Sequence, residues 1–156
     1  QSLKFRTDVA MMGKLGYDID IKKLSADELV FSQSAIKNYK RISDIVWWGD
    51  QYRLLSPYEG NRAALMYVDS TKSRAVLFHY NMNTRYNETT VRVKLQGLDA
   101  GKKYLVREIN LMPGAKSASP YNDKTYTGDY LMKVGMNLTP GKLVPLTSSV
   151  FEIREQ

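Results

Sequence analysis

Two aspartates near the start of the chain are the residues best placed to do chemistry together. Asp18 and Asp20 alternate with Tyr17, Ile19 and Ile21. This period of two predicts a strand, on which both carboxylates point to the same side. Two carboxylates on one face can act as a nucleophile and a general acid–base group. Such alternating acids also commonly face solvent or cap the next helix, and we favour that interpretation.

Histidine and cysteine usage excludes several kinds of active site. The chain has no Cys, and His79 is its single His. Disulfides, thiolate zinc sites, cysteine nucleophiles and multi-histidine metal sites are therefore excluded, and a Ser-His-Asp triad would depend on His79 alone. We interpret His79, within the apolar run 75–80, as a half-buried, hydrogen-bonded strand residue, and Asp50 as a turn residue. No phosphate-binding or zinc-hydrolase motif is present, so no cofactor and no metal ligand is predicted.

The aromatic residues offer a possible sugar-stacking surface. Trp47 and Trp48 are adjacent, and the chain holds eleven Tyr. Amphipathic aromatics more often fill a seam between domains with their polar tips hydrogen-bonded, and we favour that role. The best candidates for ligand contact are Tyr121, Tyr126 and Tyr130, in or near a polar segment at 112–128.

The positive charge of the chain is dispersed. The formal net charge is +7, and residues 51–156 hold 15 basic and 9 acidic residues. A nucleic-acid footprint would cluster its basic residues on one face or in one run, whereas here only isolated basic pairs occur. We therefore expect a solvated surface and no nucleic-acid partner. No apolar run is long enough to span a membrane, so no membrane partner is expected.

The elements that would position these residues change in character near residue 50. A strand over 17–21 is followed by a helix over 25–47, which starts at the capping box formed by Ser25 and Glu28 and ends at Gly49. This helix would be about 34 Å long. Its apolar stripe consists of Leu29, Ile36, Tyr39, Ile42 and Val46, continuing to Trp47.

The pattern after Gly49 is that of β structure throughout. Candidate strands lie at 51–55, 63–68, 74–80, 90–96, 103–109, 129–134 and 149–154, separated by turns such as Pro113-Gly114 and Pro140-Gly141. The segment 112–128 is expected to be a long loop. Several short strands at such spacing predict an antiparallel sandwich or barrel. A strand and a helix cannot bury their own faces, so we expect residues 1–48 to be the edge of a larger α/β domain.

The residues resemble those of a known enzyme family. The segment Gly49-Asp50-Gln51-Tyr52-Arg53-Leu54-Leu55-Ser56-Pro57 is similar to the G-D-x-[FY]-R-L-x-S-P junction of glycoside hydrolase family 36 α-galactosidases. The likeness covers nearly the whole chain in order, through Arg6-Thr7, Ala10-Met11, Gly13, Leu15 to Asp20, Lys23 to Glu28, Tyr39-Lys40, Asn61-Arg62, Lys94 to Asp99, and Tyr130-Leu131-Met132 with Gly135. Local departures are Asp18-Ile19 in place of Glu-Leu, and Trp47-Trp48 in place of Ile-Gln.

The resemblance implies a mainly β chain in two parts. Residues 1–49 would be the C-terminal edge of a catalytic (β/α)8 barrel, with its last strand within 10–21 and its last helix at 25–47. Residues 50–156 would be a C-terminal antiparallel β-sandwich domain. The helix stripe would pack on the barrel sheet outside this chain.

The resemblance also implies the function of a larger enzyme. The parent would be a retaining α-galactosidase that hydrolyses terminal α-galactosyl residues of oligosaccharides, with one Asp attacking and a second acting as acid–base group. Both catalytic motifs lie upstream of the matched residues, so no catalytic residue is assigned to this chain, which alone is expected to be structural and inactive.

The implied partners are galactosides through the parent enzyme, the rest of the barrel domain, and a second copy in a homo-oligomer. The expected compartment is the bacterial cytoplasm or periplasm. The alternative is a non-catalytic carbohydrate-binding module that uses the tyrosines.

Overall fold

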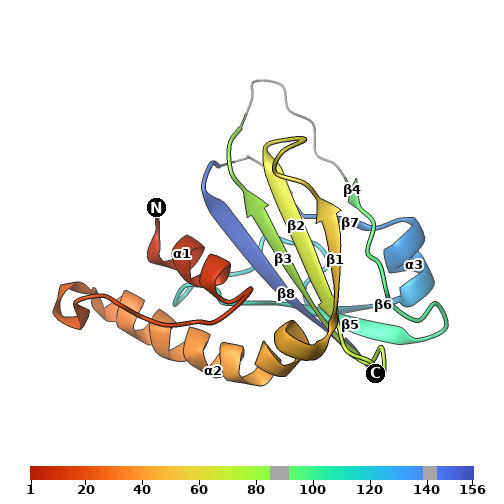
Figure 1. Cartoon of the computed structure of the whole chain (residues 1–156), viewed down its shortest axis with the longest axis horizontal. Coiled ribbons are helices and arrows are strands. Elements are labelled where there is room, and N and C mark those ends of the chain that lie inside the picture. Colours follow the sequence, from red (N-terminus) through yellow and green to blue (C-terminus); the bar gives the residue numbers. More distant parts are fainter. Residues whose placement is uncertain (85–91, 139–143) are drawn as a thin grey trace.

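The computed structural model describes residues 1–84, 92–138 and 144–156. Three helices and a short 3-10 helix accompany eight strands in these residues (Figure 1). The helical elements are α1 (Leu3–Ala10), η1 (Ile21–Lys23), α2 (Ala26–Trp48) and α3 (Gly128–Lys133). The strands are β1 (Asp50–Leu55), β2 (Arg62–Val68), β3 (Arg74–Asn81), β4 (Arg92–Val93), β5 (Lys103–Ile109), β6 (Lys124–Thr127), β7 (Met136–Asn137) and β8 (Thr147–Glu155).

The strands form one large sheet and one small ribbon. The six-stranded sheet has the order β1-β2-β3-β8-β5-β6, and each neighbouring pair in it is antiparallel. The two-stranded ribbon pairs β4 with β7. The prediction of a mainly antiparallel β fold is therefore confirmed. Over the described residues, the second layer of the expected sandwich consists of this ribbon together with α3.

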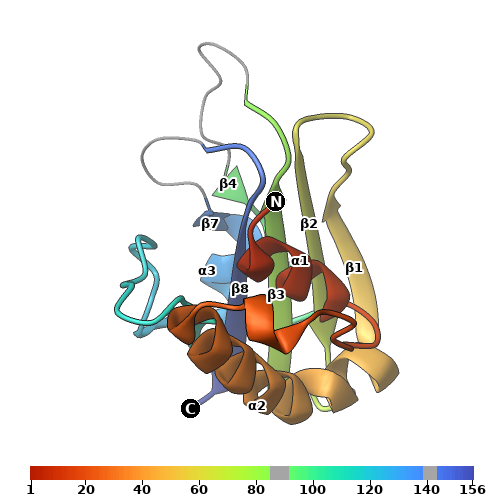
Figure 2. The same ribbon diagram turned by 90° about the vertical axis from the view of Figure 1, so that its left-hand side faces the viewer.

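Alternate residues of the sheet point into two separate cores. The face that we call the ribbon face packs against β4, β7 and α3; its large buried side chains include Met66, Leu77, Tyr104 and Phe151. The opposite face, which we call the helix face, packs against α1 and α2, as Figure 2 shows, through residues such as Tyr67, Phe78 and Val150. The chain thus has three layers: helices, central sheet, and ribbon with α3.

Helix α2 begins and ends as the sequence predicts. The Ser25 hydroxyl accepts a hydrogen bond from the Glu28 amide at 3.3 Å, and the Glu28 carboxylate accepts one from the Ser25 amide at 2.9 Å. Gly49 follows the helix at a tight crossing, where an added Cβ would lie 2.5 Å from the carbonyl oxygen of Ile45 and 2.6 Å from that of Val68. The junction therefore needs glycine for lack of space, since its φ of −80° is open to any residue.

The prediction of a strand over residues 17–21 is wrong. Residues 14–18 have no regular structure, and Ile21 opens the 3-10 helix η1. The last barrel strand expected within 10–21 is likewise not formed, because none of the described strands lies beside this segment to complete a ladder. Instead, side chains tie the segment down: Tyr17 shares a hydrogen bond with Thr7, and Tyr39 donates one to the Gly13 carbonyl at 2.6 Å.

The packing predicted for the stripe of α2 is also partly wrong. Ile42 and Val46 are buried on the helix face of this chain's own sheet rather than left for an external barrel sheet. Leu29 and Ile36 remain 36% and 37% exposed. The stripe splits because Leu29 and Ile36 lie on a different side of the helix from Ile42 and Val46.

Three further predictions in the β region are corrected. Of the strand predicted over 129–134, residues 129–133 lie in helix α3 instead, because the Thr127 hydroxyl caps the amide of Tyr130. The expected loop at 112–128 contains strand β6 at its end. Of the strand predicted over 90–96, only Arg92–Val93 pairs as a strand. Residues 90 and 91 and the Pro140-Gly141 turn lie outside the described residues.

Candidate functional site

The two aspartates that could form an acid pair lie on the surface. Asp18 and Asp20 are both exposed. Asp20 caps the 3-10 helix by accepting a hydrogen bond from the Lys22 amide at 3.1 Å, and it forms an ion pair with Lys23 at 3.7 Å. This arrangement corresponds to the capping role favoured from the sequence. Asp50, predicted to be a turn residue, is instead the first residue of strand β1, where it is exposed and pairs with Val68. The absence of catalytic residues from this chain stays a prediction.

His79 is a buried strand residue on the ribbon face. It is 3% exposed and pairs across the ladder with Ala64 and Ser149. Burial, with a smaller effect of the Arg62 charge, lowers the pKa of His79 to about 4, so the ring is neutral at neutral pH. Among the described residues its Nε2 atom has no hydrogen-bond partner, which differs from the hydrogen-bonded role expected from the sequence.

The three candidate tyrosines do come together, on the ribbon side of the sheet. Tyr126 stacks on Tyr130 with ring centroids 5.1 Å apart, and its other neighbour is Tyr121 at 5.3 Å. Tyr121 is only 5% exposed, and its hydroxyl accepts a hydrogen bond from Arg92 at 2.9 Å. Tyr126 and Tyr130 pack against the core of the ribbon face. The cluster therefore closes the edge of this core and leaves only Tyr126 and Tyr130 partly exposed.

The two tryptophans end α2 on the other side of the molecule. Trp47 is 54% exposed, and its ring nitrogen donates to the Gly13 carbonyl at 3.2 Å. Tyr39 bonds the same carbonyl and contacts the Trp47 ring edge-on at 6.5 Å. The Trp48 side chain is 84% exposed. Trp47 therefore helps to hold the segment before η1, whereas Trp48 is open on the surface.

A buried carboxylate that the sequence analysis missed joins the two ends of the chain. Asp8 of α1 is fully buried and accepts hydrogen bonds from Asn110 at 3.0 Å and from Ser148 at 2.7 Å. Lys4 forms an ion pair with it at 2.5 Å. Asn110 in turn accepts from Asn38 of α2 at 2.7 Å. No local signal distinguishes Asp8, because Lys4, Arg6 and Thr7 in the same helix are polar too, and its partners Asn110 and Ser148, more than one hundred residues away, could be found only in the fold.

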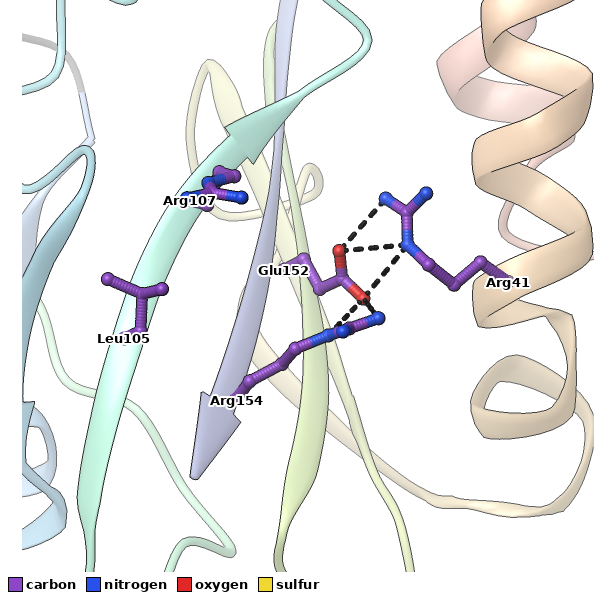
Figure 3. Close-up of a pocket in the computed structure, with 5 residues that line it drawn as sticks. All are labelled: Arg41, Leu105, Arg107, Glu152 and Arg154. Carbon is purple, nitrogen blue, oxygen red and sulfur yellow. Dashed lines mark hydrogen bonds and ion pairs between the residues drawn. The ribbon is translucent and has the colours of Figure 1, made fainter. Parts of the chain in front are cut away.

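A recess lined mainly by arginines lies on the helix face (Figure 3). It has a volume of about 300 Å³ and lies where α2 leaves the sheet, between that helix and strands β5 and β8. Its lining residues are Arg41, Leu105, Arg107, Glu152 and Arg154. Figure 3 shows Arg41 reaching from the helix toward Glu152, with Arg154 on the same strand as Glu152.

Glu152 is the anchor of this recess. Its side chain is 6% exposed. Its carboxylate accepts hydrogen bonds from Arg41 Nε at 3.1 Å and Nη2 at 2.9 Å, and from Arg154 Nε at 2.7 Å. Burial by itself would raise the pKa of Glu152, but the hydrogen bonds and charges of the two arginines outweigh it and lower that pKa below its usual value. Glu152 is therefore a carboxylate at neutral pH, enclosed by two guanidinium groups.

In the ranges that the structure describes, no group of three or more His, Cys, Asp or Glu residues could hold a metal ion. The same ranges contain no helix of the length and apolarity that crossing a membrane requires.

The fold is a mainly antiparallel β domain with α1 and α2 on one face of its sheet, and comparisons with known proteins place it in a family. Residues 62–153 match the profile of the glycosyl hydrolase family 36 C-terminal domain. Alpha-galactosidase AgaA from Geobacillus stearothermophilus is 34% identical over 137 residues, which are 88% of this chain and 17% of that protein. This chain belongs to glycosyl hydrolase family 36.

Solved structures of the family agree over the whole chain. The α-galactosidase AgaB from Geobacillus stearothermophilus matches with a TM-score of 0.84 and 32% identity, covering 100% of this chain and 20% of that one. Variants of AgaA solved with raffinose and with stachyose match with the same TM-score of 0.84 and the same coverage, at 31% and 32% identity. The chain thus spans about a fifth of the length of these relatives.

Proposed function

We propose that this chain is the C-terminal β domain, with its adjoining helices, of an α-galactosidase, and that its role there is structural. The observation that carries the proposal is the match of the entire chain to family 36 α-galactosidases with a TM-score of 0.84. The Asp20 carboxylate caps the 3-10 helix and pairs with Lys23, which supports a structural role for this carboxylate rather than a catalytic one.

The substrate of the parent enzyme would be a galactoside. AgaA variants have been solved with raffinose and with stachyose, which supports oligosaccharides with terminal α-galactosyl residues as the substrate class. Residues 1–49 would belong with the (β/α)8 catalytic barrel and residues 50–156 would form the appended sandwich. The nucleophile and the acid–base group would both come from barrel segments outside this chain.

Helix α2 offers a surface on which that catalytic domain would pack. Leu29, Ile36 and Trp47 are spaced by seven and eleven residues, close to whole numbers of helical turns, so they follow one line along the helix. All three side chains are at least 36% exposed. They lie away from Ile42 and Val46, which are buried on the helix face. This second apolar line supports burial against another domain.

The first experiment measures turnover by the chain alone. We expect no hydrolysis of an aryl α-galactoside above the uncatalysed rate. Turnover that survives repurification and disappears in Asp18→Asn or Asp20→Asn would contradict the proposal, because these are the two carboxylates that could act as a pair.

The second experiment tests the structural role directly. The segment of AgaA that matches this chain is replaced by this chain, and the hybrid is compared with AgaA that lacks the segment. We expect the hybrid to hydrolyse raffinose and the shortened enzyme to be insoluble or inactive. Ile36→Ser and Trp47→Ser in the hybrid should lower its melting temperature, whereas the same change at exposed Trp48, which lies off the line, should lower it less. Equal activity with and without the segment would contradict the proposal.

The second candidate function is carbohydrate binding by the tyrosines, and the stacked pair Tyr126 and Tyr130 favours it. Titration with raffinose, followed by the NMR signals of both rings, tests it. Trp fluorescence would not report on this site, because Trp47 and Trp48 belong to the helix layer on the opposite side of the sheet. Shifts that are abolished by Tyr130→Ala would support binding. An unchanged spectrum would contradict it, and the structural role would then be the one proposed function that remains.

A further inference from the structure

We propose that the recess between α2, β5 and β8 binds an oxyanion, specifically a phosphate group. This site is independent of the galactoside chemistry of the proposed parent. It would be formed by Arg41, Arg107 and Arg154, which come from three different elements and meet around a cavity of about 300 Å³. The fold therefore holds three guanidinium groups close together against their mutual repulsion.

The side chains that line the recess carry a net positive charge. Its lining contains three guanidinium groups and the single carboxylate of Glu152. Both oxygens of that carboxylate are occupied, Oε1 mainly by Arg154 and Oε2 by Arg41. Glu152 therefore acts as a template that orients two arginines, and one unit of positive charge remains on this trio.

Arg107 forms the third side of the site, and most of its N–H groups make no hydrogen bond to the described part of the chain. Its Nε atom donates to Asp123 at 2.7 Å. Within the described part of the chain, its two terminal nitrogens have no hydrogen-bond partner, and neither has Nη1 of Arg41. The side chains of Arg41, Arg154 and Arg107 are 38%, 46% and 59% exposed, so they are accessible to a solute.

The chemistry of the donors favours phosphate over other ligands. Guanidinium groups bind phosphate and carboxylate oxygens through paired, charge-assisted hydrogen bonds. Donors that approach from a helix on one side and two strands on the other suit a tetrahedral group, which presents oxygens in several directions. The lining has one aliphatic residue, Leu105, and no aromatic ring, so it offers nothing on which a neutral sugar would stack.

The test is a titration of the chain with inorganic phosphate, followed by ¹H–¹⁵N spectra that include the arginine Nε–H signals. We expect saturable shifts at Arg41, Arg107 and Arg154 that sodium chloride at equal ionic strength does not reproduce. If chloride produces the same shifts, or if phosphate moves signals elsewhere on the surface instead, the proposal is overturned.

Two substitutions, one at Arg107 and one at its partner Asp123, should change the affinity for phosphate in opposite directions. Arg107→Gln should weaken phosphate binding about tenfold, as expected from the loss of one charge-assisted contact. Asp123→Asn should strengthen binding, because it removes the competing anion; the φ of 55° at this position is one that Asn accepts readily. Arg53→Gln, an exposed arginine on strand β1 at the far edge of the sheet, is the matched control and should leave binding unchanged. Equal weakening by Arg107→Gln and Arg53→Gln would overturn the proposal.

Further titrations identify the source of the phosphate group. Inorganic phosphate, a hexose phosphate and the neutral hexose are compared on the same protein. Tighter binding of the hexose phosphate would assign the site to a phosphorylated sugar, and equal binding of the two would assign it to free phosphate. Binding of the neutral hexose with the same Arg107 dependence would overturn the proposal.

Discussion

The two faces of the central sheet are closed by different kinds of interaction. The ribbon face is closed around an apolar cluster with Leu77, Phe151 and Tyr104 at its centre, and His79 is also buried on this side of the sheet. The helix face has an apolar patch as well, but polar groups surround it: Asp8 is bonded to Asn110 and Ser148, and Glu152 to Arg41.

The difference follows from where the covering elements come from. The ribbon, α3 and the sheet that they cover all belong to residues 50–156, and apolar packing without direction is enough to close this core. The helix face is covered by α1 and α2, which precede the whole sheet in the chain. A helix can slide on an apolar surface, whereas the hydrogen bonds of Asp8 and Glu152 specify one position. We infer that these polar groups determine the position of α1 and α2 on the sheet. The following substitutions test this difference between the two faces.

The largest effect is expected from an apolar truncation on the ribbon face. Phe151→Ala should lower the free energy of unfolding by about 4 kcal/mol, because Phe151 is 1% exposed and its loss leaves a cavity. Urea denaturation measures this change. Phe78→Ala, the equivalent truncation on the helix face, should cost a similar amount, since both side chains are fully buried in apolar surroundings. A cost below about 1.5 kcal/mol for Phe151→Ala would mean that this core is loosely packed.

Removal of the buried carboxylate on the helix face comes next. Asp8→Ala should cost about 3 kcal/mol, because it leaves the Lys4 charge and the Asn110 and Ser148 donors without their partner. Asp8→Asn keeps the shape and one acceptor, so it should cost less. If Asp8→Ala unfolds at the same urea concentration as the unchanged protein, the polar network does not hold α1 on the sheet.

The two faces should respond to acid over different pH ranges. His79 on the ribbon face has a folded-state pKa of about 4, below its ordinary value of 6.5, so the unfolded chain binds the proton first. Stability is therefore full above pH 6.5 and falls as the pH decreases, by about 2 kcal/mol between pH 6.5 and 5. Glu152 on the helix face has a lowered pKa, so its contribution is lost only below about pH 4.5.

Unfolding measured at several pH values checks this order. His79→Leu should remove most of the change between pH 6.5 and 5, because the chain has no other His. A pH dependence that persists unchanged in His79→Leu would show that another group is responsible.

The smallest effect is expected at the start of α2. Ser25→Ala should cost about 1 kcal/mol, because the Glu28 amide loses its capping acceptor. The same substitution at Ser34, exposed within the helix, is the control and should be neutral or slightly stabilising, since Ala is the better helix former. If both variants have the same stability, α2 is held by its packing alone and the cap adds nothing.

Local interactions explain which elements were predictable. The capping box of α2, the glycine after it and most strands from β1 to β8 depend on residues close together in sequence, and the structure confirms them. The residues of the family 36 junction, 49–57, are also consecutive, and the family is confirmed. The prediction of a strand at 129–134 is wrong, because the Thr127 cap starts a helix there.

The sequence by itself therefore determined the family, the antiparallel class and the boundaries of the long helix. Only the tertiary structure decided that Ile42 and Val46 pack on the chain's own sheet, that residues 17–21 form no strand, and that Asp8 lies buried beside Asn110 and Ser148. It also brought Arg41, Arg107 and Arg154 around one recess. These features depend on contacts between residues up to 140 positions apart. No local pattern encodes such contacts, because a strand needs a neighbour and a buried charge needs a partner, and both are supplied by the fold.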